Sequence, residues 1–111
     1  MALKTNNPST VRNTVNIKAR IERELEEIVT LIQLSDPQNQ SKIHKKLTFI
    51  YKLLERFRED EKENLFSSDK LALDYLEGEV VEFIKKMEEK TTLELLAMAK
   101  SLQHATKNTL G

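Results

Sequence analysis

The sequence predicts an all-α fold: an elongated antiparallel helical bundle of three long helices and a shorter C-terminal helix, which we expect to self-associate. One observation is the spacing of apolar residues, which recur every three or four positions over most of the chain. The other is the helix-start signals that interrupt this pattern at three places. These signals are Asp36-Pro37, Ser67-Ser68-Asp69 and the capping box Thr91-Thr92-Leu93-Glu94.

The composition of the 111 residues excludes several classes of protein. The chain has no cysteine, which excludes disulfide frameworks, thiolate nucleophiles and cysteine-ligated metals. Its two glycines, Gly78 and Gly111, are too few for a phosphate-binding loop. We see neither a secretory signal nor an apolar run of about 20 residues, so we expect a cytoplasmic protein without a membrane partner.

The chain length indicates a single helical-bundle domain over residues 10–107. Residues 1–9 are polar and contain Pro8, which predicts a flexible N-terminal arm, and residues 108–111 are expected to form a C-terminal tail. The formal net charge is zero, with 18 basic and 18 acidic residues, so the total charge indicates no strongly charged partner.

The first helix is expected over residues 10–34, where one face gathers most of the apolar side chains. Its N-terminal part is ambiguous, because Val15, Ile17 and Ala19 alternate with polar residues as they would in a strand. Asn13, Thr14 and Asn16 are also poor helix formers. The pattern therefore leaves open whether residues 12–19 are helix or strand. The apolar face comprises Val11, Val15, Ile21, Leu25, Ile28, Val29 and Ile32, with Ile17 at its edge.

The second helix is expected over residues 37–65 and has the most regular pattern of the chain. Its apolar residues alternate spacings of four and three, which is the heptad seam of coiled-coil packing. Phe49, Leu53 and Tyr51 widen this stripe, which favours a bundle over an isolated two-stranded coiled coil. The seam consists of Ile43, Leu47, Ile50, Leu54 and Phe57, and Leu65 continues it.

The third helix is expected over residues 68–90 and the fourth over residues 92–107. The gap between them is so short that one helix kinked at the threonines is an alternative to two separate helices. Gly78 lies inside the third helix, where glycine costs about 1 kcal/mol relative to alanine, so either a second backbone approaches it or the helix bends. The predicted core positions are Leu73, Leu76, Val80, Phe83, Ile84 and Met87, followed by Leu95, Met98, Ala99, Leu102 and Ala105.

A second apolar flank on the third helix suggests a function as a non-enzymatic protein–protein interaction module, a small adaptor or regulatory protein. The partner is expected to be another protein or a second copy, so that a homo-oligomer forms by burial of this flank. The alternative is that both flanks are simply enclosed by the other three helices. The predicted interface residues are Leu71, Tyr75, Gly78, Val81, Phe49 and Leu53.

No catalytic, cofactor or metal site is expected from the sequence, and no small-molecule substrate. A di-iron site in a helical bundle needs Glu-x-x-His twice, but Ser41 precedes His44 by three residues and Ser101 precedes His104. The acidic clusters around Glu24 and Glu61 are interleaved with basic residues, which is typical of solvated helix faces. Ser67 and Ser68 have no adjacent base, and helix capping accounts for them.

The alternative function is a nucleic-acid-binding regulator. If residues 13–19 formed a strand, the order strand, helix, helix would match a ribbon-helix-helix region, in which Asn16 and Lys18 read bases. A helical version of this hypothesis uses a basic stripe that contacts phosphates. The predicted contact residues are Arg12, Asn16, Lys18, Arg20, Lys42, Lys45, Lys46 and Lys52.

Overall fold

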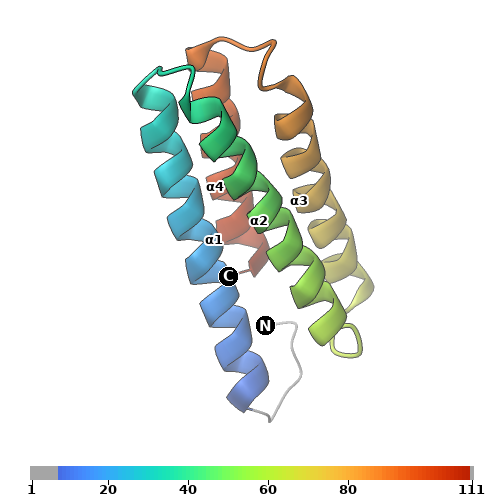
Figure 1. The fold of residues 1–111 in the computed structure, drawn as a ribbon. Coiled ribbons are helices and arrows are strands. Elements are labelled where there is room, and N and C mark those ends of the chain that lie inside the picture. The colour runs from blue at the N-terminus through green and yellow to red at the C-terminus, as the bar shows by residue number, and fades with distance from the viewer. Residues whose placement is uncertain (1–7, 111) are drawn as a thin grey trace.

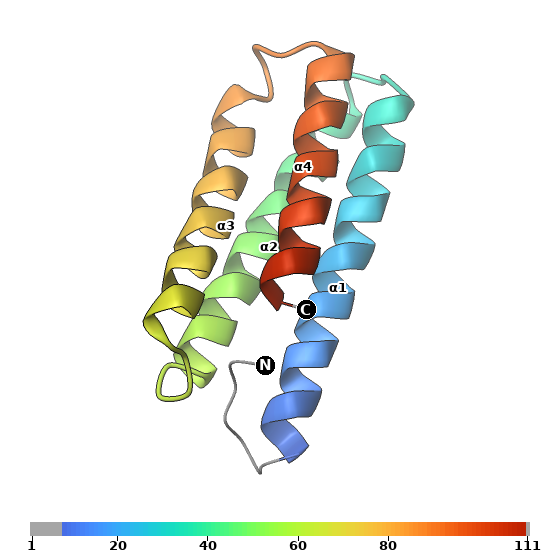
Figure 2. The same ribbon diagram turned by 180° about the vertical axis from the view of Figure 1, so that it is seen from behind.

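The computed structural model describes residues 8–110, and it describes side chains for residues 16–109. Four helices run antiparallel to their neighbours: α1 (Pro8–Gln33), α2 (Asn39–Asp60), α3 (Ser67–Lys86) and α4 (Thr92–Leu110). α1 and α3 each pack against both α2 and α4, so the helices form a ring in chain order (Figures 1 and 2). The bundle measures 46 × 22 × 19 Å, which confirms the predicted elongated helical bundle.

The core lies along the axis of the ring and receives side chains from all four helices. All five residues of the predicted seam in α2 are buried, as are Leu73, Leu76, Val80, Phe83 and Met87 of α3. Ile17, predicted at the edge of the apolar face of α1, belongs to the core, whereas Val29 and Ile84 are only partly buried against it. The regular spacing of apolar residues therefore identified the packed faces of the helices correctly.

α1 is helical from Pro8 to Gln33, so the strand interpretation of residues 12–19 is wrong. Ile17 and Ile21 are both buried and lie one turn apart, which continues the helical stripe through the ambiguous segment. Pro8 occupies the first helical position, where its fixed backbone angle suits a helix and its missing N–H is not needed. The helix begins two residues before the predicted start at Thr10, and the rest of the predicted arm lies outside the described residues.

The connection between α1 and α2 reverses the chain within five residues. Ser35 adopts a left-handed backbone conformation with φ of 52°, which ends α1. Asp36 was predicted as the N-cap of the second helix, but the N-cap is Gln38. Asp36 lies in the turn before the helix, where its Oδ1 accepts a hydrogen bond of 2.9 Å from the Gln38 N–H. The backbone N–H of Asn39 donates to the Asp36 carbonyl at 2.8 Å. α2 begins at Asn39, two residues after the proline of the predicted start.

α2 ends at Asp60, although the sequence predicts a helix to Leu65. The stretch from Arg58 to Asn64 contains no apolar residue, so a further helical turn would have nothing to bury against the bundle. Instead the chain turns: the N–H of Asn64 donates to the Glu61 carbonyl at 2.8 Å, and the Asn64 side chain donates to Glu61 Oε2 at 3.2 Å. Glu61 is thereby buried, contrary to the expected solvated face.

α3 begins one residue earlier than predicted, with Phe66 at the N-cap position. Asp69 Oδ2 accepts a hydrogen bond of 2.9 Å from the Phe66 N–H, so of the three predicted caps only Asp69 satisfies a backbone group at this terminus. Ser67 and Ser68 lie in the first turn of the helix instead of capping it. The expectation that capping accounts for these two serines is therefore wrong.

α3 and α4 are separate antiparallel helices, so the alternative of one kinked helix is wrong. The predicted capping box is present: the Glu94 N–H donates to Thr91 Oγ1 at 3.2 Å, and the Thr91 N–H donates to Glu94 Oε1 at 3.1 Å. α4 extends to Leu110, through most of the predicted tail, and its 19 residues make it only one residue shorter than α3. Within residues 8–110, every helix is too short or too polar to cross a membrane.

Candidate interaction surfaces

Two apolar side chains of α3 project from the bundle instead of into it. Leu71 is 68% exposed and Tyr75 is 55% exposed, one helical turn further along. Gly78 follows Tyr75 by three residues and is also exposed. Because residues three and four apart on a helix are neighbours, these three residues form one stripe, which we call the α3 face. The interpretation that both flanks of α3 are enclosed by the other helices is therefore wrong for Leu71 and Tyr75.

Nothing in the described part of the chain requires a glycine at position 78. A Cβ atom built on it would meet no atom within 4 Å, and its φ does not lie in the left-handed region. No second backbone of the described chain approaches it. The α3 face therefore combines two projecting side chains with the open space beside Gly78, which we call the notch.

The remaining predicted interface residues lie elsewhere or are less exposed. Val81 is half-buried in the following turn of α3. Phe49 of α2 faces α1, since the guanidinium carbon of Arg20 lies 5.0 Å from the centre of its ring. Leu53, one turn after Phe49, is partly buried against the core. The structure thus does not place Phe49 and Leu53 on the surface that contains Leu71 and Tyr75.

A second surface of distinct character lies along α1 and α2. It displays five exposed basic residues, and none of them forms an ion pair with another described residue. We call it the α1/α2 face, and it consists of Arg20, Arg23, Lys42, Lys45 and Lys52.

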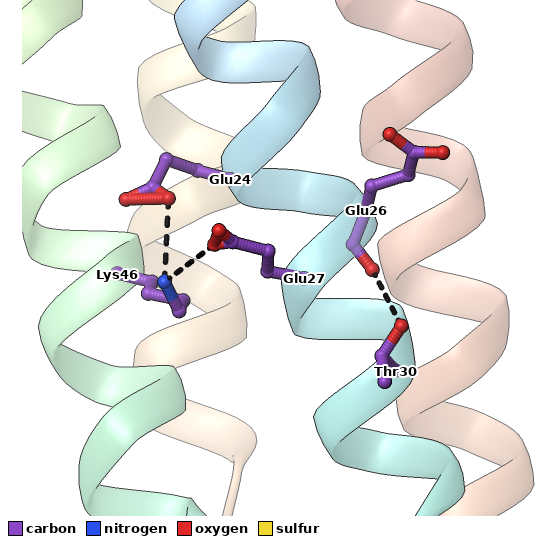
Figure 3. A network of polar contacts seen from close by, with 5 residues as sticks. All are labelled: Glu24, Glu26, Glu27, Thr30 and Lys46. Atoms are coloured by element: carbon purple, nitrogen blue, oxygen red, sulfur yellow. Dashed lines mark hydrogen bonds and ion pairs between the residues drawn. The ribbon is translucent and has the colours of Figure 1, made fainter.

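Lys46, which was predicted with this basic stripe, is engaged between the two helices. Its Nζ donates to Glu24 Oε2 at 3.3 Å and to Glu27 Oε2 at 3.0 Å (Figure 3). The hydrogen bond to Glu27 raises the pKa of Lys46. The same bond and the charge of the ammonium group lower the pKa of the Glu27 carboxyl. Glu24 is only 7% exposed, so this carboxylate was wrongly expected on a solvated face.

Of the three other predicted nucleic-acid contacts, the structure describes the side chains of Asn16 and Lys18. Asn16 is exposed, and Lys18 is half-buried. Lys18 lies two residues before Arg20, so the two side chains point to different sides of the helix. The side chain of Arg12 lies outside the described residues. Because residues 13–19 are helical, Asn16 and Lys18 cannot read bases from a strand as the ribbon-helix-helix hypothesis required.

Arg58 joins α2 to α3 on the acidic side of the bundle. Its Nη2 lies 2.7 Å from Asp74 Oδ1 and 2.9 Å from Glu77 Oε1, and its Nε donates to the same Glu77 oxygen at 3.1 Å. Arginine suits this position because its planar group holds two carboxylates at once. These contacts leave the Leu71 and Tyr75 side chains uncovered, although Asp74 lies between them in sequence.

The two histidines lie in open grooves between helices. His104 lines a groove of about 480 Å³ between α1 and α4 together with Glu22 and Glu26, and its Nε2 lies 3.0 Å from Asn108 Nδ2. His44 lines a groove between α2 and the end of α3. Within residues 16–109, no three potential ligands among His, Asp and Glu converge on a point suitable for a metal ion.

No protein-family model, no curated protein and no solved structure matches this chain. The candidate function therefore rests on the α3 face and the α1/α2 face.

Proposed function

We propose that this protein is a non-enzymatic interaction module that buries the α3 face against a helix of another chain. The observation that carries this proposal is the exposure of Leu71 and Tyr75, one turn apart on a helix that is otherwise well packed. An exposed tyrosine contributes strongly when a partner desolvates it, because the ring buries a large area at a small entropic cost. Single exposed leucines are ordinary, but two large apolar side chains on one stripe beside a notch favour an interface.

The partner that fits this stripe most directly is a second copy of the chain. In a pair of antiparallel α3 helices, a two-fold axis passing between Leu76 and Glu77 places each Tyr75 opposite Gly78 of the other copy. Such an interface is self-complementary, because one surface supplies both the projecting ring and the notch. It also supplies the close backbone approach that an interior glycine permits and that the isolated bundle does not use.

Sedimentation equilibrium tests this proposal with Tyr75→Ala as the central variant. We expect the wild-type chain to self-associate. In the variant, the free energy of dissociation should be lower by more than about 1 kcal/mol, which raises Kd roughly fivefold or more. Leu93→Ala is the matched control, since Leu93 is 79% exposed on α4 and lies outside the α3 face. A wild-type chain that stays monomeric up to about 1 mM, or equal losses in the two variants, would contradict the proposal.

A further inference from the structure

We infer that the α1/α2 face binds the phosphodiester backbone of a nucleic acid. This inference does not depend on the α3 face, because none of the five cations lies on α3, and Arg20 and Arg23 lie on α1, which is opposite α3 in the ring of helices (Figures 1 and 2). A chain paired through α3 leaves the outer surface of α1 open.

The α1/α2 face has an excess of unpaired positive charge. On α2, no acidic residue occurs between Asp36 and Glu55, while Lys42, Lys45 and Lys52 are exposed. On the facing side of α1, the carboxylates of Glu24 and Glu27 are both bound to Lys46 of α2. The exposed lysines of α2 therefore keep their charge available for an external anion.

The cations are arranged in two rows on rigid elements. Lys42 and Lys52 are ten residues apart on α2, which corresponds to about 15 Å along the helix axis. Arg20 of α1 stacks on Phe49, and Phe49 lies four residues after Lys45 and three before Lys52. The stacking orders the guanidinium group beside the row of lysines while its N–H donors remain able to bind a phosphate oxygen. An extended series of phosphates matches such rows better than a single small anion does.

The apolar content of this face argues against a membrane or a protein as the partner. The large apolar side chains that are exposed within residues 16–109 are Leu34, Phe66, Leu71, Tyr75 and Leu93, and none of them lies among the five cations. A helix that binds a membrane surface needs an apolar face to insert, and a protein interface is usually anchored by apolar or aromatic side chains. Contacts to nucleic-acid phosphates need neither.

The distribution of charge between the two halves of the bundle also favours this face. Residues 8–60 contain ten basic and eight acidic residues, whereas residues 61–110 contain seven basic and ten acidic residues. The α3–α4 half of the bundle therefore repels an anion that the α1/α2 face attracts. The zero net charge of the whole chain conceals this separation.

Fluorescence anisotropy with a labelled 20-base-pair DNA duplex of mixed sequence tests the inference, with a duplex RNA of the same sequence as a second arm. If all five cations contact phosphates, binding should weaken roughly 500-fold between about 50 and about 200 mM salt. Replacing Lys42, Lys45 and Lys52 together by glutamine should reduce this loss to roughly 12-fold, because two phosphate contacts remain. Lys100→Gln with Lys107→Gln, two exposed lysines of α4, is the control and should behave like the wild type.

Several results would overturn the inference. One is the absence of binding to either duplex at about 50 mM salt, where contacts to phosphates are strongest. Another is an unchanged salt dependence in the triple variant, provided that its circular dichroism and thermal unfolding match the wild type. Binding to vesicles containing phosphatidylserine without binding to either duplex would assign the face to a membrane instead. Each of these results leaves the sedimentation test of the α3 face unaffected.

Discussion

Lys46 on α2 and Glu24 on α1 form an ion pair of 3.3 Å that joins the first two helices at the edge of the core. The Glu24 side chain is 9% exposed and that of Lys46 is 26% exposed, so the pair is partly shielded from water. Glu27 lies on the outer side of the same ammonium group. The charge of Lys46 thus allows a carboxylate to be buried between two apolar helix faces.

Lys46→Met is expected to lower the free energy of unfolding by about 1–3 kcal/mol, because it leaves the buried Glu24 carboxylate without its partner. Urea denaturation followed by circular dichroism measures this loss. Lys45→Met is the control, since Lys45 is the exposed neighbour and forms no ion pair with another described residue. Similar losses in the two variants would mean that the ion pair does not stabilise the bundle.

The pair of Lys46 and Glu27 predicts a pH dependence of stability. The folded-state pKa of Glu27 is lowered from 4.5, so its contribution is complete above about pH 4.5 and is lost as the pH falls through the folded pKa. The pKa of Lys46 is raised from 10.5, so its contribution is lost only as the pH rises above that value. Urea midpoints measured between about pH 7 and about pH 3 should fall less steeply for Glu27→Gln than for the wild type. A steeper fall in the variant would contradict the assignment.

Thr91→Ala is expected to destabilise the protein by about 1 kcal/mol, because the Glu94 N–H loses its hydrogen-bond acceptor at the start of α4. Thr91→Ser should retain most of the stability, since serine keeps the hydroxyl. Thr92→Ala, in the next position, is the control for a general effect of threonine removal, because it removes only an exposed contact of 3.4 Å with Ser35 Oγ and no bond to a backbone group. Thermal unfolding of the three variants distinguishes a specific cap from a nonspecific loss.

Gly78→Ala is expected to change stability and association in opposite directions. The added methyl group meets no atom within 4 Å, and alanine favours a helix over glycine by about 1 kcal/mol, so the bundle should become more stable. If Tyr75 of a second copy packs against the notch, the same methyl group should weaken association. Urea denaturation at a low protein concentration and sedimentation equilibrium separate the two effects. A more stable chain with unchanged association would show that the notch is not used.

The sequence predicted the packed faces well because burial in a bundle depends mainly on spacing along each helix. Ile43 and Phe57 are fourteen residues apart, and both are buried as the heptad seam of α2 required. The helix ends were less predictable. The end of α2 at Asp60 depends on where the bundle stops offering apolar contacts, which the spacing of Leu65 does not reveal.

The surfaces were predicted less well than the core because they depend on how neighbouring helices are aligned. No spacing within α1 indicates that Glu24 meets Lys46, since this contact depends on the relative position of two helices along their axes. The same limit explains why Phe49 was assigned to the interface of α3, although Arg20 of α1 lies over it. Tyr75 and Leu71 were identified because their position on α3 alone places them outside the core.

The packing of α4 against α1 makes completion of the bundle a late event during protein synthesis. Until α4 leaves the ribosome, the surface of α1 that it covers has no neighbour. The nascent chain of three helices is therefore prone to bind other apolar surfaces, including those of chaperones. The packing of α4 against α1 and α3 therefore both completes the ring of helices and covers this surface.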